Sequence, residues 1–471
     1  MRGFLAYSTG VACTAALVLP LSFSSGAHAA SSQVPDVPGS TQSLPLEAIG
    51  PRATDGPLGR SAEQGLTERD VRPFSLVGVV WDDVDAELHG TVQVRTRALG
   101  SARWSGWQDV ETHNDEHRAD RGTEESDSGK VRGSTAPLWV GESDGVEVRV
   151  KGGRAERAPL PKGLRLELVD PGAAPEPTEG HEPGVANRTA ADTPEGEPEE
   201  WDVPPALSEE EPDVLPALSE EEPDEFPGLS EEEPDVLPGL SEEEPDVLPA
   251  LSEEETKAQA ADPEMAEKPY IGPRPSIITR KGWGADESLR EKEFAYTTTV
   301  KAAFVHHTAT GNSYTCAQAP SVLRSIYRYH VVSSGWRDIG YNFAIDKCGN
   351  IYEGRAGGVD KAVLGAHTLG FNTDSMGIAV LGTYSLSTPP AAAVTAIAKL
   401  TAWKLGLFGA DPSGKVVLTS GGSGKYAKGV KVSFNVISGH RDGYITDCPG
   451  GRLYSKLGTV RSAAATYQGR G

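Results

Sequence analysis

Two regions of the chain carry regular hydrophobic patterns, and the two patterns differ. Between residues 71 and 170, apolar and polar residues alternate in short segments such as GTVQVRTRA, GVEVRVKG and LRLELVD, which Gly, Ser and charged residues separate. A two-residue period with frequent turn signals predicts an antiparallel β-sandwich. We therefore expect residues 71–170 to form an all-β accessory domain.

From residue 267 to 471 the pattern alternates between strands and helices. An apolar strand is expected at residues 301–307, and Pro320 opens a helix whose apolar residues repeat on one face. Thr388 followed by proline gives the start signal of a second long helix. Further strands are expected at 341–345, 351–354 and 376–381. Strands interleaved with helices predict an α/β domain with a mixed central sheet flanked by helices.

An acidic repeat of eleven residues separates the two regions. Units of the form ALSEEEPDVLP begin at Ala206, Ala217, Gly228 and Gly239, and a truncated copy ends at residue 255. Each unit has two prolines and too few apolar side chains to bury a core. We expect residues 171–266 to be a disordered linker, a flexible tether that lets the two regions move independently. Binding of a cation, a basic wall component or a partner protein is the alternative.

The first 29 residues resemble a secretory signal peptide. One arginine precedes an apolar stretch, and Ala27-His28-Ala29 has the small-x-small form of a cleavage site. We expect a secreted product, extracellular or cell wall associated, with residues 30–70 as a flexible N-terminal segment. Lipid attachment at Cys13 is the alternative. No later stretch approaches the roughly 20 apolar residues that a membrane span needs.

The net charge of −24 is concentrated in the repeat. Residues 201–255 hold 21 acidic and no basic residues, so the rest of the chain carries only −3. This balance gives no support for nucleic-acid binding, and we expect a monomer. The length of 471 residues allows about three domains at roughly 150 residues each.

Three cysteines remain once the signal segment is removed. Disulfides persist outside the cell, and the odd count predicts a pair between Cys316 and Cys348, with Cys448 left as the thiol available to a metal. The alternative is that all three are buried thiols.

His306, His440 and Cys448 are the strongest candidates for chemistry. The last two lie eight residues apart in GHRDGYITDCPG. Structural zinc sites normally use four protein ligands, whereas catalytic sites use three and keep a position for water. If these three side chains converge, we expect an open position that holds a hydrolytic water.

Four segments of the C-terminal region resemble the peptidoglycan recognition protein and type 2 N-acetylmuramoyl-L-alanine amidase family. They are FVHHTAT, YRYHVVSSGWRDIGYNFAIDKCGNIYEGR, GAHTLGFNTDSMGIAVLGTY and SGHRDGYITDCPG. The resemblance covers about residues 273–457, and the overall layout is similar to that of secreted actinobacterial members.

This resemblance implies that His306, His440 and Cys448 bind Zn²⁺. It further implies a secreted enzyme that hydrolyses the amide between N-acetylmuramic acid and the L-alanine of the peptidoglycan stem peptide, with peptidoglycan or muropeptides as its partners. Members that only bind peptidoglycan typically lack the cysteine, so Cys448 favours the hydrolase. A non-catalytic peptidoglycan-binding recognition protein is the alternative.

The resemblance also assigns catalytic and binding roles. Tyr341 matches the tyrosine of the family's DIGY motif and Thr446 lies two positions before the cysteine, so both can donate hydrogen bonds to a developing oxyanion. The general base stays open between the Tyr341 phenol and a relay through water. The expected substrate-binding residues are His367, Asn372, Trp336 and Arg355. Of these, Arg355 can hold a carboxylate of the stem peptide in a bidentate pair.

Plain structural roles compete with several of these assignments. His307 should point to the opposite side of its strand, His330 lies on an apolar helix face, and His367 can be structural. The tryptophans of the β-rich region are either carbohydrate platforms or core and edge residues; they are Trp81, Trp104, Trp107 and Trp139. Cys448 as a nucleophile is disfavoured because the adjacent carboxylate of Asp447 would raise its pKa.

Overall fold

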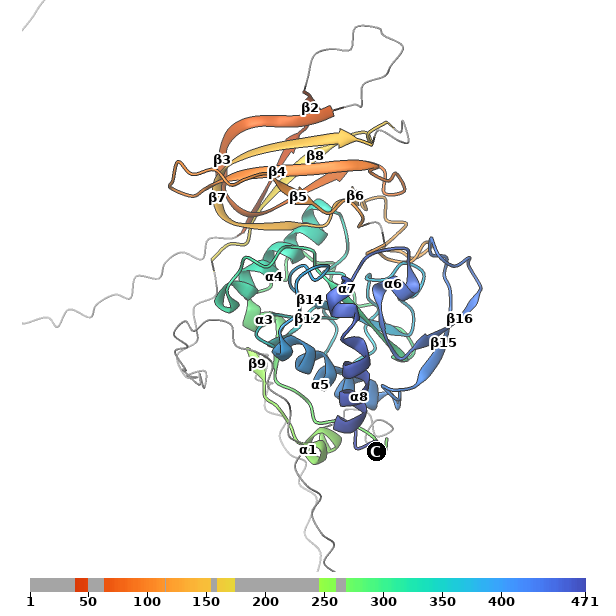
Figure 1. Ribbon diagram of the computed structural model, residues 1–471. Coiled ribbons are helices and arrows are strands. Elements are labelled where there is room, and N and C mark those ends of the chain that lie inside the picture. Colours follow the sequence, from red (N-terminus) through yellow and green to blue (C-terminus); the bar gives the residue numbers. More distant parts are fainter. Residues whose placement is uncertain (1–38, 50–62, 115, 154–158, 174–244, 260–267) are drawn as a thin grey trace, which may run out of the picture. The chain divides into compact units, whose positions relative to one another are not determined.

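The protein is described by a computed structural model that covers residues 39–49, 63–114, 116–153, 159–173, 245–259 and 268–471 (Figure 1). Residues Pro38–Gly471 form one compact unit. The expected signal peptide and most of the acidic repeats lie outside the described residues.

The N-terminal domain is built from antiparallel strands. They are β1 (Ser40–Pro45), β2 (Glu47–Ala48), β3 (Glu63–Trp81), β4 (Gly90–Ala98), β5 (Gln108–Val110), β6 (Gly133–Ser134), β7 (Leu138–Gly152) and β8 (Arg165–Asp170). Their order is β1-β8-β3-β7-β4-β5, with β2 and β6 also paired to β3. The predicted sandwich thus takes the form of one connected sheet, in which register shifts between β3 and β7 mark bulges that let long strands bend.

The prediction of a flexible segment at residues 30–70 is wrong for the part that the structure describes. β1 pairs with β8 over its whole length, from Ser40 opposite Asp170 to Pro45 opposite Arg165. Leu46 is buried in the core of the domain. Most side chains of β1 are not buried, so its sequence has only a weak apolar pattern. The strand is held mainly by backbone pairing with β8.

The tryptophans of this domain fall into two groups. Trp81 and Trp139 are buried, which confirms the interpretation of these two as core residues. Trp104 and Trp107 are half-buried, and the Arg149 guanidinium lies 4.0 Å from the ring centre of Trp107. Arginine on a ring face is a stabilising cation–π contact, which fits the edge interpretation.

The C-terminal domain has the predicted mixed sheet flanked by helices (Figure 1). Its order is β17-β11-β14-β12-β13-β10-β9. The strands are β9 (Val247–Leu248), β10 (Ile277–Ile278), β11 (Ala302–His307), β12 (Phe343–Ile345), β13 (Ile351–Glu353), β14 (Ser375–Val380) and β17 (Ile437–Gly439). β11 runs parallel to both β14 and β17, whereas β12 and β13 are antiparallel. A separate hairpin joins β15 (Lys415–Thr419) and β16 (Lys431–Asn435).

Helices cover both faces of this sheet. Residues of α5 (Ala391–Leu407) and α8 (Leu457–Tyr467) pack against one face, and α4 (Ala319–Arg328) contributes to a second core on the other. Because successive side chains of a strand point to opposite faces, Val305 of β11 lies in the first core and Phe304 on the other side. The shorter helical elements are α3 (Arg280–Trp283), η1 (Cys316–Gln318), the π-helical turn η2 (Tyr329–Ser333), α6 (His440–Gly443) and α7 (Gly451–Tyr454).

The two predicted helix starts have different outcomes. α4 has Pro320 in its first turn, as expected. The N-cap of α5 is Pro390 rather than Thr388. A residue that precedes proline avoids the helical region, so Thr388 and Pro389 stay outside the helix, which begins only after the second proline.

The prediction of a disordered linker at residues 171–266 is wrong for residues 245–259. β9 pairs antiparallel with β10 at the edge of the sheet, and α1 (Glu253–Ala258) follows it. Ser252 and Glu255 form a reciprocal capping box at the start of α1. This piece of the repeat folds because the edge of β10 supplies backbone partners that the repeat cannot supply to itself.

The two domains share a buried core, which contradicts the idea of independently tethered modules. Leu76, Val80 and Trp139 of the N-terminal sheet pack in one cluster with residues of α4 and β12. The hydroxyl of Tyr329 donates to the carbonyl of Thr135 at 3.1 Å. The segment FSLVGVVW in β3 is mostly apolar on both faces, because one face packs on its own domain and the other on the C-terminal domain.

Candidate metal centre

The three predicted ligands converge, and a fourth side chain joins them. His117, His306, His440 and Cys448 each offer one donor atom, and these four atoms lie within 4.8 Å of one another. All four residues are buried. His306, His440 and Cys448 were expected from the sequence, whereas His117 was not.

Neighbouring parallel strands bring the two predicted histidines together. His306 is the penultimate residue of strand β11, and β17 pairs with β11 so that Val305 lies opposite Gly439. His440 follows Gly439 directly and begins α6. The rings of His306 and His440 are therefore only 4.4 Å apart between centres.

Cys448 reaches the same point from the loop after α6. Its Sγ lies 3.8 Å from Nδ1 of His306 and accepts a hydrogen bond from the backbone N–H of His307 at 3.4 Å. The backbone N–H of Cys448 donates to the hydroxyl of Thr446 at 3.1 Å. These contacts fix the sulfur against the end of β11.

His117 comes from the N-terminal domain. It lies in the loop of residues 116–132, which we call the 116–132 loop, between β5 and β6. Its Nε2 is 3.1 Å from Nδ1 of His440 and 3.7 Å from Sγ of Cys448. The length of this segment is one weak sign of such a residue, since long loops without secondary structure are often functional.

The electrostatics of the cluster suit a cation. Burial lowers the pKa of His117 to about 3, and burial with the neighbouring imidazoles lowers the pKa values of His306 and His440 well below their ordinary range. These rings are therefore neutral and keep a lone pair for a metal. Burial raises the pKa of the Cys448 thiol, so a divalent cation would have to displace that proton on binding. Nitrogen and sulfur donors in this number fit zinc.

Tyr341 lies beside the cluster as a neutral phenol. Its ring centre is 5.5 Å from that of His306 and 5.9 Å from that of His117. Burial, with smaller effects of Cys448 and Glu116, raises the pKa of Tyr341 well above its ordinary value. It is therefore a hydrogen-bond donor at neutral pH, which argues against its use as the general base.

Arg355 holds a carboxylate in a bidentate pair, but the carboxylate belongs to this chain. Both terminal nitrogens donate to Glu125 of the 116–132 loop, each at 2.9 Å. The Nε of Arg355 donates to the carbonyl of Ile339 at 2.8 Å, which fixes the plane of the guanidinium. The guanidinium therefore has the fork geometry that the sequence led us to expect for a stem-peptide carboxylate.

Asn372 also contacts the 116–132 loop. Its Nδ2 donates to Asp120 at 2.7 Å and to the carbonyl of Arg118 at 3.0 Å, while its Oδ1 accepts from the backbone N–H of His367 at 2.8 Å. The backbone N–H of Gly370 donates to the same Asp120 oxygen at 2.6 Å. Two of the four predicted substrate-binding residues are thus covered by the loop.

The other two predicted substrate-binding residues are buried. His367 is fully buried, and its ring centre lies 5.3 Å from that of His306. Thr368 connects the two rings, since its hydroxyl is 3.0 Å from Nδ1 of His367 and 3.5 Å from Nε2 of His306. Trp336 is buried with its ring centre 4.3 Å from that of His330. Both fit positioning roles better than substrate contact.

His307 and His330 fit the structural roles proposed from the sequence. His307 Nδ1 accepts from the backbone N–H of Tyr384 at 3.1 Å. His330 Nδ1 accepts from the backbone N–H of Gly340 at 3.3 Å. Both rings are therefore neutral packing elements near the cluster.

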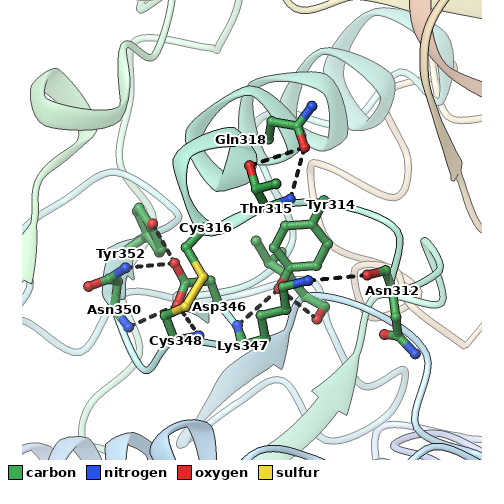
Figure 2. The surroundings of a disulfide bond; sticks show 11 residues. Asn312, Tyr314, Thr315, Cys316, Gln318, Asp346, Lys347, Cys348, Asn350 and Tyr352 are labelled. Atoms are coloured by element: carbon green, nitrogen blue, oxygen red, sulfur yellow. Dashed lines mark hydrogen bonds between the residues drawn. A yellow bond between two sulfur atoms is a disulfide. The ribbon is translucent and has the colours of Figure 1, made fainter. Parts of the chain in front are cut away.

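The predicted disulfide between Cys316 and Cys348 is present (Figure 2). It ties η1, which leads directly into α4, to the turn between β12 and β13. Asp346 organises this turn, accepting from the backbone N–H of Cys348 at 2.9 Å and from the hydroxyl of Tyr352 at 2.9 Å. Cys448 is the free cysteine among the described residues.

A cavity of about 760 Å³ opens on one side of His117. Its lining includes Cys448, Thr446 and Tyr341 from the C-terminal domain and Glu111 and Leu138 from the N-terminal domain. The metal-ligand cluster therefore borders a large void, which Glu116 and His117 at the start of the 116–132 loop also line.

Comparison with known proteins gives a match for each domain. Residues 296–451 match a family described as N-acetylmuramoyl-L-alanine amidase, and residues 29–184 match one described as Rv3811 N-terminal galactose-binding domain-like. Peptidoglycan-recognition protein SC2 of Drosophila melanogaster is 33% identical over 184 residues, which are 39% of this chain and 85% of the relative. The chain belongs to the peptidoglycan recognition protein family.

This peptidoglycan recognition family member has two further similarities of note. The N-acetylmuramoyl-L-alanine amidase of Homo sapiens is 32% identical over 203 residues, which are 42% of this chain and 30% of the human chain. The structure of wild-type Drosophila PGRP-LB covers 39% of this chain and 92% of its own, at 26% identity and a TM-score of 0.31. Within the described part of the chain, no helix combines the length and apolar character of a membrane span.

Proposed function

We propose that this protein is a secreted, zinc-dependent N-acetylmuramoyl-L-alanine amidase. Its reaction would be hydrolysis of the amide between N-acetylmuramic acid and the L-alanine of the peptidoglycan stem peptide. The observation that carries the proposal is the convergence of His306, His440 and Cys448 beside Tyr341. The amidase family match and the similarity to a human protein named for this activity support it.

Zinc, when bound by these side chains, supplies a water with a pKa of about 7 and polarises the scissile carbonyl. The protein's own groups would do the rest. The neutral phenol of Tyr341 donates a hydrogen bond to the carbonyl oxygen as negative charge develops there. The hydroxyl of Thr446 accepts the Cys448 N–H and keeps its own proton for a second donation from the cavity side.

The proton of the attacking water needs an acceptor other than Tyr341, whose raised pKa keeps it protonated. A relay through water in the cavity is the route that remains among those expected from the sequence. On the substrate, a carboxylate of the stem peptide has its receptor in Arg355, whose guanidinium is already oriented by Ile339.

Product analysis tests this function. We expect an extended digest of purified peptidoglycan with the full chain to release free stem peptides that begin with L-alanine, identified by mass spectrometry. Cys448→Ala should bind zinc more weakly and lose peptide release, whereas the disulfide variant Cys316→Ser/Cys348→Ser should keep the zinc affinity of the wild type. If neither the wild-type chain nor the loop variants described below release peptides, the proposed activity is wrong.

A further inference from the structure

The 116–132 loop leaves the N-terminal domain and runs along the C-terminal domain. At one end the backbone N–H of Leu369 donates to the carbonyl of Glu116 at 2.9 Å. At the other end the backbone N–H of Arg132 donates to the carbonyl of Ser334 at 3.0 Å. Between these anchors, the side chains of His117, Asp120 and Glu125 point at three different features of the candidate site.

With a metal bound by the other three side chains, His117 would hold the position that a hydrolytic water needs. Three protein ligands with an open position are typical of catalytic zinc sites, whereas four protein ligands are typical of structural ones. With Nε2 at 3.1 Å from Nδ1 of His440 and 3.7 Å from Sγ of Cys448, His117 completes a set of three imidazoles and one sulfur. Such a set leaves a tetrahedral ion without a free position.

Asp120 and Glu125 occupy the polar groups that we expect to bind the stem peptide. Glu125 is buried and gives Arg355 a carboxylate in the bidentate arrangement. Asp120 accepts from both Asn372 and the backbone of Gly370. Two acidic side chains of one loop thus satisfy the same donors that an acidic peptide would satisfy.

The loop therefore divides the site into two halves. The half around Arg355 and Asn372 is filled by the loop, while the cavity beside Thr446 and Cys448 stays open. A ligand can approach the cluster from the cavity, but an extended stem peptide cannot reach Arg355 until the loop leaves.

We propose that His117 is a fourth metal ligand supplied by the N-terminal domain, and that the 116–132 loop holds the enzyme in a self-inhibited state by closing the metal site and filling the peptide half of the groove. The latency part rests on the proposed amidase function, whereas the ligand part does not. Activation then requires displacement of the loop, for which a peptide carrying a carboxylate for Arg355 is the competitor of matching chemistry.

Metal coordination is the first test, because it needs no activity. X-ray absorption at the zinc edge should give three imidazoles and one sulfur for the full wild-type chain. His117→Ala should give two imidazoles, one sulfur and one oxygen donor. His113→Ala is the matched control, since His113 is an exposed histidine just before the loop with a side chain 77% accessible, and its spectrum should equal that of the wild type.

Peptide release is the second test. If the closed form outnumbers the open form by about 10 to 1, opening the site raises the apparent rate by about tenfold. We expect a rise of at least this size in His117→Ala and none in His113→Ala. Glu125→Gln is the second loop variant in case His117→Ala does not fold, and it should raise both the rate and the affinity for a soluble muropeptide.

The outcomes separate the two proposals. A wild-type spectrum with two imidazoles and an oxygen donor, unchanged in His117→Ala, would overturn the ligand assignment whatever the activity. A loss of peptide release in His117→Ala would overturn latency and make His117 part of the working site. If the wild-type spectrum shows three imidazoles but no variant releases peptides, His117 is confirmed as a ligand and the proposed amidase activity is wrong.

Discussion

Glu125 and Arg355 form a buried bidentate ion pair between residues 230 positions apart in the sequence, with both N···O distances at 2.9 Å. Burial alone would raise the pKa of Glu125, but the Arg355 guanidinium outweighs it, with help from the backbone N–H of Arg337, and the net pKa lies below its ordinary value. The pair joins the 116–132 loop to the C-terminal domain, so it bears on stability as well as on access to the site.

Removal of one partner of this pair should be costly. Arg355→Ala leaves the Glu125 carboxylate buried without its counterion, and breaking such a pair typically costs about 3–5 kcal/mol. Urea unfolding of the zinc-loaded full chain measures it. Arg121→Ala is the control, because Arg121 is 62% and its partner Asp85 61% exposed and such pairs contribute about 0–1 kcal/mol. Equal losses of unfolding free energy in the two variants would show that the buried pair stabilises the protein no more than the exposed pair does.

His330 should make stability fall at acid pH. Burial lowers its pKa to about 3, so the folded protein keeps this ring neutral while the unfolded chain binds a proton below about 6.5. Because the unfolded state then holds more protons, stability falls as pH drops from about 6.5 towards 3, by about 1.4 kcal/mol per pH unit for this group.

The variant His330→Phe isolates that contribution. At pH 7 it should be less stable than the wild type by about 1–3 kcal/mol, because the N–H of Gly340 loses its acceptor. Towards acid pH the two stability curves should converge, since the variant lacks the proton uptake of this ring. Unfolding free energies at a series of pH values check this, and parallel curves would rule out His330 as a source of the acid sensitivity.

Tyr341→Phe should lower turnover without removing the metal. Loss of one oxyanion donor typically costs about 10²- to 10³-fold in kcat. The comparison belongs in the His117→Ala background, where we expect the site to be open, with zinc content measured on the same samples. Turnover near that of the parent would remove the phenol from the mechanism.

The disulfide should stabilise the fold without affecting the metal centre. Cys316 and Cys348 are separated by 32 positions, and a bridge closing such a loop contributes about 2–4 kcal/mol. We expect Cys316→Ser/Cys348→Ser to lose stability of this order in denaturant while keeping its zinc, because Cys448 is the proposed sulfur ligand. Loss of zinc would show that the bridge also positions the ligands.

Local patterns in the sequence predicted much of the C-terminal domain. The strand at residues 301–307 and the eight-residue spacing of His440 and Cys448 are set by near neighbours in the chain, so they could be read directly. The disulfide followed from counting cysteines. The end of the acidic repeat could not be predicted, because residues 245–259 fold only against the edge of β10, a partner that their own pattern does not reveal.

By itself, then, the sequence determined three metal-ligand candidates, the mixed sheet that holds two of them and the alternating strands of the N-terminal domain. Only the tertiary structure decided that His117 and Glu125 enter the site. Nε2 of His117 meets His440 across 323 positions, and that contact exists because two apolar faces, one on β3 and one on α4, bury each other. The 116–132 loop has no periodic pattern, and where it lies depends on how the domains that carry it pack together.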